Sequence, residues 1–392
     1  MRIAVIGALP SSLINFRGPL LKAIVEQGHE VVTAANGRDP CTEVKLRMLG
    51  VEYCPIRIAR TGMNPLADIA ALFDILRLTL RVRPDVVLSY TIKPVIYGAL
   101  AARLCGVRRV LTMIEGLGRA FMPCESFTHF VSSIAAKGLY RIALRCSDRI
   151  FFLNPDDLNQ FLEQGYVTKQ QAVLLDGIGV DLAYYSRAEM EISDSTCLRF
   201  LMIARLLRDK GVREYVEAAK MVKARRQYAE FLLAGAMDEN PSSINQEELA
   251  SWLREGLVNY VGYLQEVRPL FRNCHVYVLP SYREGTPRTV LEALATARAV
   301  ITTDAPGCRE TVSLPVNLSF GRAEGGSWNL KIGRNGILVP VKDARSLAEA
   351  MEYFFKHPKQ ITLMGNESRA YAEHRYDVNK VNALILDQMG IM

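Results

Sequence analysis

The chain has 392 residues, of which 49% are hydrophobic and 23% charged, and its formal net charge is +7. This length exceeds one ordinary hydrophobic core and favours two domains of about 150 to 200 residues each. The sequence holds no apolar run of about 18 residues, which excludes a membrane-spanning helix. It also lacks zinc-finger spacing and basic residues interleaved with aromatic ones, so a nucleic-acid partner is not expected.

Short apolar, β-branched segments alternate with helix-like segments along the whole chain. In the first half, strands are predicted at residues 2–7, 29–34, 85–90, 108–114, 148–153 and 171–176. The helices predicted between them span residues 17–28, 65–83, 94–105 and 130–147. The second half continues with strands at 198–204, 229–235, 257–262, 274–280 and 298–304. Continuous apolar strands are typical of parallel sheets, so the sequence predicts an α/β fold with two Rossmann-like, doubly wound domains.

The boundary between the domains is expected near residues 178–197, where neither helical nor strand periodicity appears. We therefore assign residues 1–185 to an N-terminal domain and 195–376 to a C-terminal domain, with a last helix in 377–392 returning to the first. Neither domain opens with G-x-G-x-x-G, which disfavours a dinucleotide-dependent dehydrogenase. The sequence contains no D-x-D motif and no cluster of histidines, so no metal site is predicted. Eight cysteines without C-x-x-C spacing fit reduced thiols of a cytosolic protein.

The stretch SYREGTPRTVLEA, residues 281–293, contains a turn that opens into a helix. We predict Thr286 as the cap of this helix and Pro287 as its first residue. The stretch follows a strand, and ligands of open α/β sheets bind at the carboxyl ends of strands. The backbone N–H groups at 286–289 are therefore expected to form an anion site.

A carboxylate stands on each side of that turn. Glu284 can accept hydrogen bonds from the hydroxyls of a sugar beside the anion site, and Glu292 can hold a vicinal diol such as a ribose. The other interpretation of Glu292 is an ion pair with Arg288 on a solvated helix face, and the residues alone favour neither.

Two cations follow an earlier strand of the second half, in MIARLLRDKGVREYVEAA, residues 202–219. Arg205 comes directly after the strand, and Lys210-Gly211 precede a helix. Both cations should lie at the same sheet edge as Glu284, where they can hold a diphosphate and offset charge that grows on it. Two surface cations in a basic chain are the alternative.

These motifs together resemble the retaining glycosyltransferases of family 4. The resemblance rests on ARLLRDKG followed by EGTPRTVLEA, which match the R…KG and E-x7-E signatures, and on DGIGVD, YVGYLQEVRPLFRNCHVYVLPS and GRNGILVP. It implies a GT-B fold, with two domains facing across a cleft, and a UDP-sugar donor without a metal. INFRGPLLKAI, MIEGLG and AGAMDENPSSI are similar to a bacterial subgroup that adds a sugar, often an N-acetylhexosamine, to an undecaprenyl-diphosphate-linked saccharide.

The resemblance also implies roles for individual residues. The catalytic residues would be Arg205, Lys210, Glu284 and Glu115, with the two cations at the donor diphosphate and Glu115 facing the reactive carbon from the first domain. The donor would be bound by Gly262, Tyr263, Leu264, Gly285, Thr286, Pro287, Arg288 and Glu292. The acceptor or its lipid diphosphate would meet Arg17, Lys93, Gly116, Lys137, Arg141 and Arg145.

Two helices suggest contact with an anionic membrane surface. Lys137, Arg141 and Arg145 form a basic stripe at i, i+4, i+8, and residues 66–80 form a wide apolar face that ends in arginines. The alternative is a core helix with a solvated basic face. The lipid-linked acceptor implied by the resemblance favours a cytoplasmic protein held peripherally on the inner face of the membrane.

The chain departs from the family in two places. Only Gly7 follows the first strand, where many members have two glycines, and an insertion falls near residues 315–332. Two other functions are compatible with the sequence. One is a UDP-sugar 2-epimerase on the same fold, and the other is a nucleotide-sugar-binding protein without catalysis.

Overall fold

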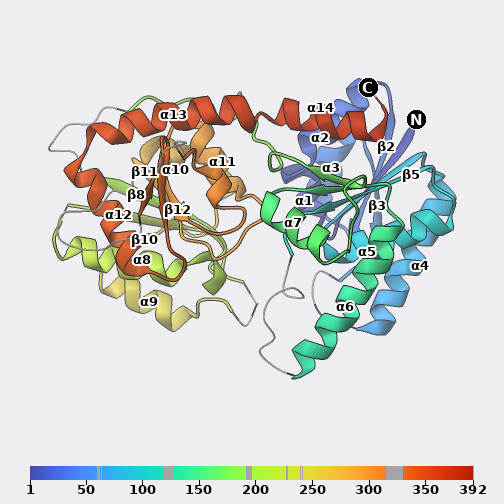
Figure 1. The fold of residues 1–392 in the computed structure, drawn as a ribbon, viewed down its shortest axis with the longest axis horizontal. Coiled ribbons are helices and arrows are strands. Elements are labelled where there is room, and N and C mark those ends of the chain that lie inside the picture. The colour runs from blue at the N-terminus through green and yellow to red at the C-terminus, as the bar shows by residue number, and fades with distance from the viewer. Residues whose placement is uncertain are drawn as a thin grey trace. The chain divides into compact units, whose positions relative to one another are not determined.

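The computed structural model describes residues 1–391 except 60, 61, 63, 118–126, 191–196, 227, 239, 241 and 315–329, and of 127–132 it describes only the backbone. The chain forms two compact units (Figure 1). One comprises Met1–Ile178 with Val378–Met392, and the other comprises Gly179–Asp377. The first division lies within the stretch expected to link the domains. Most of the predicted insertion, residues 315–329, lies outside the described residues.

The first unit contains a parallel sheet with the strand order β3-β2-β1-β4-β5-β6-β7. Its strands are β1 (Arg2–Ile6), β2 (Glu30–Asn36), β3 (Glu52–Ile56), β4 (Val86–Tyr90), β5 (Arg109–Ile114), β6 (Arg149–Phe152) and β7 (Ala172–Leu174). Its helices are α1 (Pro10–Asn15), α2 (Gly18–Glu26), α3 (Pro40–Met48), α4 (Pro65–Val82), α5 (Ile92–Leu104), α6 (Phe127–Arg145), α7 (Pro155–Glu163) and α14 (Val378–Met389).

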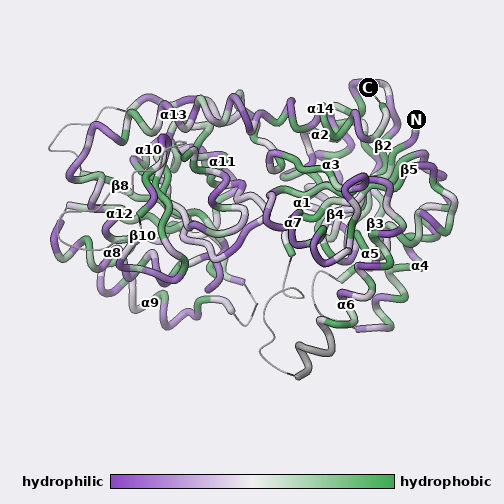
Figure 2. Tube along the Cα trace, in the orientation of Figure 1, coloured by the Kyte–Doolittle hydropathy of each residue, from purple (hydrophilic) through white to green (hydrophobic). Residues whose placement is uncertain are grey.

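Hydrophobic residues cover both faces of this sheet. On β1, Ile3 and Val5 belong to a core shared with α1, α2, α3 and α14, whereas Ala4 and Ile6 belong to a core shared with α4, α5, α6 and α7. This division follows from the alternation of side chains along a strand. It explains why the strands are continuously apolar in sequence, and Figure 2 shows hydrophobic residues concentrated in the strands.

The second unit contains a sheet with the order β10-β9-β8-β11-β12-β14-β13, in which only β13 runs antiparallel. Its strands are β8 (Arg199–Ile203), β9 (Glu230–Ala234), β10 (Asn259–Tyr260), β11 (Val276–Leu279), β12 (Ala299–Thr303), β13 (Lys331–Ile332) and β14 (Gly336–Val339). Its helices are α8 (Val212–Lys223), α9 (Gln246–Arg254), α10 (Arg268–Asn273), α11 (Arg288–Ala295), α12 (Ala344–Lys356), α13 (Lys359–Arg375) and the short 3-10 helices η2 (Arg208–Lys210) and η3 (Arg309–Thr311).

The structure confirms the α/β class with two doubly wound sheets of seven strands each. Three strands were not predicted: β3, β13 and β14. The sequence of β3, EYCPI, contains a glutamate and a proline, which a strand tolerates at the edge of a sheet, where β3 lies. The last helix, α14, packs on α2 of the first unit (Figure 1).

Candidate functional site

Lys210 and Glu284 meet at the carboxyl edge of the second sheet. Lys210 ends η2, which follows β8, and Glu284 follows β11, the neighbour of β8. The Lys210 Nζ atom lies 2.5 Å from the Glu284 Oε1 atom, and the two side chains are 17% and 15% exposed. The structure therefore brings these two predicted site residues into a largely buried ion pair.

Glu284 is held from two sides. The Ser281 hydroxyl donates a hydrogen bond of 2.8 Å to the same carboxylate oxygen, and the Glu284 backbone N–H donates to the Pro306 carbonyl. Gly307 has a φ of +78°, and a Cβ there would lie 2.2 Å from the Glu284 carbonyl oxygen. Only glycine fits such a close approach in this backbone conformation, so the turn that carries Glu284 has little room to move.

Gly211 explains the Lys-Gly pair of the sequence. Its φ is +74°, and a Cβ there would lie 2.1 Å from the carbonyl oxygen of Pro280, at the end of β11. The Tyr282 backbone N–H also donates to the Asp209 carbonyl at 2.8 Å. Gly211 thus allows the turn carrying Lys210 to press directly against the segment that leads to Glu284.

Arg205 has a carboxylate partner that the sequence did not identify. Its Nη1 atom lies 2.8 Å from the Asp238 Oδ2 atom, while much of the Arg205 side chain remains exposed. The segment around Asp238 is joined to the one after β8 by backbone bonds from Leu206 to Ala236 and from Arg208 to Ser242. Asp238 lies in the stretch AGAMDENPSSI, but nothing in that stretch indicates which cation it faces.

The start of α11 differs from the prediction. The helix begins at Arg288, Pro287 is its N-cap, and no side chain caps it. The Thr286 hydroxyl donates instead to the Gly285 carbonyl at 2.9 Å. Thr286 as cap and Pro287 as first helical residue were therefore wrong by one position, because Pro287 itself adopts the extended conformation of a cap. Gly285, Thr286 and Pro287 still lie between Glu284 and the helix, as expected.

Glu292 lies on the buried face of α11. Its side chain is 4% exposed, its carboxylate lies 2.8 Å from the Arg288 Nε atom, and it is hydrogen-bonded to Tyr185. Burial raises the pKa of Glu292, and Arg288 opposes this shift. The ion pair considered from the sequence is thus present, but on a buried face rather than a solvated one. Buried carboxylates whose pKa is shifted are concentrated at functional sites, so Glu292 is a candidate for binding a ligand.

The remaining predicted donor residues follow β10 at the same edge of the second sheet. Gly262 has a φ of +75°, and its carbonyl accepts from the Gly235 N–H at 2.9 Å. The side chains of Tyr263 and Leu264 are exposed. They are therefore available to a ligand at this edge.

In the first unit, Arg17 and Glu115 come together although they are far apart in sequence. Arg17 precedes α2, Glu115 follows β5, and the guanidinium donates a hydrogen bond to the Glu115 carboxylate. Arg17 is 2% exposed and Glu115 is 23% exposed. Gly116, next to Glu115, has a φ of +146°.

The other predicted acceptor residues lie on two helices. Lys93, in the first turn of α5, is largely buried and lies 2.6 Å from Asp68 of α4. Arg141 and Arg145 are exposed along α6, and Lys137 is half-buried on the same helix. Arg17 and Lys93 therefore each engage a carboxylate, whereas the α6 arginines face solvent.

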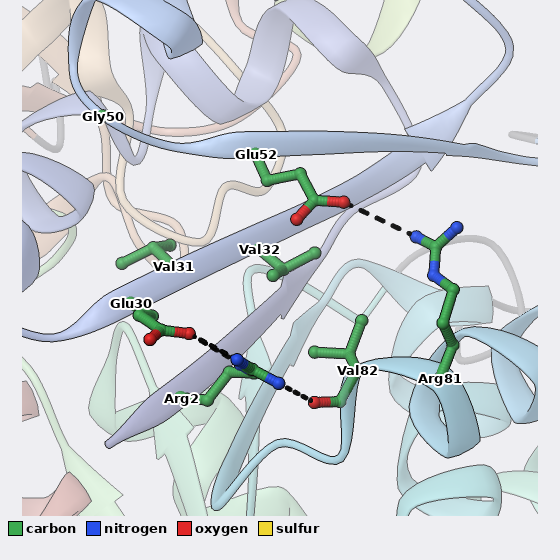
Figure 3. Close-up of a pocket in the computed structure, with 8 residues that line it drawn as sticks. All are labelled: Arg2, Glu30, Val31, Val32, Gly50, Glu52, Arg81 and Val82. Carbon is green, nitrogen blue, oxygen red and sulfur yellow. Dashed lines mark hydrogen bonds and ion pairs between the residues drawn. The ribbon is translucent and has the colours of Figure 1, made fainter.

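The hollow in Figure 3, about 360 Å³ in volume, lies elsewhere. It is lined at the amino ends of β1, β2 and β3 and at the end of α4, and the ion pairs Arg2–Glu30 and Arg81–Glu52 lie along it. Ligands of open α/β sheets bind at the opposite edge, so this hollow is not a candidate active site.

In the part of the chain that the structure describes, no three acidic, histidine or cysteine side chains lie close enough together to hold a metal ion. None of the helices described combines the length and the apolar character needed to cross a bilayer.

Family models place the chain among known enzymes. The model "Glycosyl transferases group 1" matches residues 198–357, and "Glycosyl transferase 4-like domain" matches residues 18–177. Together they cover most of the chain. The chain therefore belongs to the group 1 glycosyltransferases, family 4.

Individual proteins are similar over the full length. The chain is 27% identical over 97% of its length, and 96% of the relative's, to N,N'-diacetylbacillosaminyl-diphospho-undecaprenol alpha-1,3-N-acetylgalactosaminyltransferase of Campylobacter jejuni. A glycosyltransferase structure from Rickettsia africae superposes with a TM-score of 0.74 at 18% identity, covering 100% of this chain and 98% of that one. Anabaena HepE, in complex with UDP-glucose, gives 0.73 at 16% identity, covering 100% of both chains. These structures share the GT-B fold.

Proposed function

We propose that the protein transfers an N-acetylhexosamine, with N-acetylgalactosamine as the first candidate, from a UDP-sugar to an undecaprenyl-diphosphate-linked saccharide. The Lys210–Glu284 pair at the carboxyl edge of the second sheet is the observation that carries the proposal. A cation fixed beside a carboxylate there can meet both the diphosphate and the sugar of a donor. The name of the Campylobacter relative and the UDP-glucose held by Anabaena HepE support the choice of substrates.

Each donor-site residue has a role in this proposal. Lys210 and Arg205 offset the charge that grows on the leaving diphosphate, and Glu284 accepts hydrogen bonds from the sugar hydroxyls. Glu292, held by Arg288 and Tyr185, accepts bonds from the ribose hydroxyls. The backbone from 262 to 264 borders the uracil.

We also propose that the anomeric configuration is retained without a glycosyl-enzyme intermediate. Such an intermediate would need a carboxylate beneath the reactive carbon. Glu284 is already engaged by Lys210 and Ser281, and Glu115 by Arg17, so both are better suited to orienting hydroxyls. The departing β-phosphate would take the proton of the acceptor hydroxyl as that hydroxyl attacks from the same face. Glu115 would orient the acceptor hydroxyl.

A screen of labelled UDP-sugars with polyprenyl-diphosphate-linked acceptors tests this function. UDP should be released in step with sugar transfer and only when an acceptor is present. UDP-sugar epimerisation without an acceptor would support the 2-epimerase instead. Tight UDP-sugar binding with no turnover for any acceptor would support the binding protein.

Transfer is expected to continue in EDTA. In the proposed site, Lys210 and Arg205 stabilise the leaving diphosphate, and fixed cations can serve this purpose in place of a metal. The measurement compares initial rates in EDTA and in added Mg²⁺ or Mn²⁺. A strict requirement for either metal would contradict this description of the phosphate site.

We propose further that α4 and α6 rest on an anionic membrane surface. Helix α4 has two apolar faces: Ala71, Ile75, Leu78 and Val82 are buried in the core, whereas Leu66, Ile69, Phe73 and Leu80 are each more than half exposed. Helix α5 packs between α4 and α6, whose Ile134 and Ile142 are also exposed (Figure 1). The exposed arginines of both helices match the charge of an anionic leaflet.

Phe73→Glu is expected to weaken binding to vesicles of anionic phospholipid by about 10-fold or more, because a buried phenylalanine contributes about 1.5 to 3 kcal/mol. Cosedimentation of the purified protein with the vesicles measures this. Met48→Glu on α3 is the matched control, because Met48 is 82% exposed but lies outside the proposed surface. Equal loss in both variants, or none in Phe73→Glu, would contradict the assignment of α4.

A further inference from the structure

Arg17 lies in a buried cluster at the carboxyl edge of the first sheet. Its guanidinium donates to the Glu115 carboxylate and contacts the Met113 sulfur at 2.9 Å, and it lies 4.7 Å from the centre of the Tyr90 ring. Burial of an arginine is costly unless a carboxylate compensates its charge. Glu115 supplies that charge, so the two side chains depend on each other.

The fold fixes the Arg17 side chain through Tyr90. The Tyr90 hydroxyl lies 2.8 Å from the Ser12 hydroxyl, which in turn donates to the Leu9 carbonyl at 2.6 Å. A Cβ at Gly7 would lie 2.4 Å from the Tyr90 hydroxyl oxygen, so no other residue leaves room for the ring. The single glycine after β1, unexplained in the sequence, therefore serves to seat Tyr90 beside Arg17.

We propose that Arg17 is a positioning residue that keeps the Glu115 carboxylate ionised and in one orientation toward the acceptor hydroxyl. This rests on the proposed function, in which Glu115 orients that hydroxyl. Arg17 donates a hydrogen bond to the Oε1 atom of Glu115, and no described residue donates one to the second carboxylate oxygen, Oε2. The Glu115 side chain is 23% exposed, and we expect the acceptor hydroxyl to bond to this second oxygen.

The charge of Arg17 favours the ionised form of the Glu115 carboxylate. Burial raises the pKa of Glu115, and Arg17 lowers it. Among the described residues, the other titratable groups that interact with Glu115 are Tyr90 of β4 and Tyr140 of α6, and burial raises the pKa of each well above its ordinary value. Both therefore stay neutral, and Arg17 is the one cation among the described residues that favours the ionised carboxylate. Without Arg17, Glu115 should take up a proton at higher pH.

The test compares rates of transfer from about pH 5 to about pH 9 in Arg17→Gln, Arg17→Lys and Glu115→Gln. Arg17→Gln should lower kcat at neutral pH by about 10-fold or more, with KM for the UDP-sugar unchanged. The fall in rate on the acid side of the pH profile should also shift to higher pH. Arg17→Lys keeps the charge and should restore most of the rate. Arg103→Gln, which breaks the exposed pair with Asp148 in the same unit, should behave as wild type.

The double variant Arg17→Gln/Glu115→Gln separates positioning from a purely structural role. It removes both buried charges, so it should fold even where Arg17→Gln alone does not. Its rate should match that of Glu115→Gln, because Arg17 acts through Glu115. A further 10-fold loss in the double variant, or an unshifted profile in Arg17→Gln, would overturn the inference. A wild type without any transfer would instead contradict the proposed function, and this inference with it.

Discussion

Lys210→Ala is expected to lower kcat for sugar transfer by about 100-fold or more while changing the affinity for UDP-sugar far less. Negative charge on the β-phosphate grows as the glycosidic bond breaks, so a cation beside it acts mostly in the transition state. Lys210 is well placed for this because Glu284 and the close approach of Gly211 fix its position. Arg205→Ala should have an effect in the same direction.

The measurement pairs kcat with the Kd for UDP-sugar in the same preparation. Lys220→Ala is the matched control, since Lys220 lies in the same unit and pairs with Glu255 on the surface, where an ion pair contributes about 1 kcal/mol or less. A folded Lys210→Ala enzyme with wild-type turnover would remove the basis for the phosphate site.

Gly211→Ala is expected to reduce the free energy of unfolding by well over 2 kcal/mol and to lower activity with it. A left-handed φ alone costs a non-glycine residue about 1 to 2 kcal/mol. At Gly211 the new Cβ would also overlap the Pro280 carbonyl oxygen, so the turn carrying Lys210 must move away from Glu284. The substitution should therefore destabilise the fold and disturb the geometry of the Lys210–Glu284 ion pair.

Urea unfolding of Gly211→Ala and Gly256→Ala isolates the close approach. Gly256 also has a positive φ, +64°, but a Cβ there would meet no atom within 4 Å. Gly256→Ala should therefore show only the backbone cost of about 1 to 2 kcal/mol, and its activity should be unchanged. Equal destabilisation of the two variants would contradict the role given to the packing of Gly211 on Pro280.

The sequence was sufficient for most strands of both sheets, because a strand buried on both faces is largely apolar along its length. It was insufficient for β3, β13 and β14. β3 and β13 lie at sheet edges, where one face or one edge meets solvent, so β3 contains Glu52 and Pro55, and β13 has only two residues. β14 is buried inside the second sheet, but it has only four residues, one of them a glycine. These strands form because a neighbouring strand offers hydrogen bonds, which is a property of the folded sheet.

The same distinction applies to the site. That Lys210 and Glu284 lie at one edge follows from their positions after two strands of one parallel sheet. The pairing of Arg17 with Glu115 depends instead on the spatial order β1-β4-β5, which brings together residues that are far apart in the chain. The partnership of Arg205 with Asp238 was not predicted either, because the sequence does not show how the segments after β8 and β9 approach each other. The start of α11 was misplaced by one residue because Pro287 adopts the extended conformation of a cap.

The central claim is tested most directly by the linkage that the purified protein makes between a labelled UDP-N-acetylhexosamine and a polyprenyl-diphosphate-linked saccharide. Nuclear magnetic resonance of the isolated product gives the anomeric configuration of the sugar added. We expect label in the lipid-linked product only when donor and acceptor are both present, with the α configuration of the donor kept. An inverted linkage, or no transfer from any UDP-sugar to any such acceptor, would contradict the account.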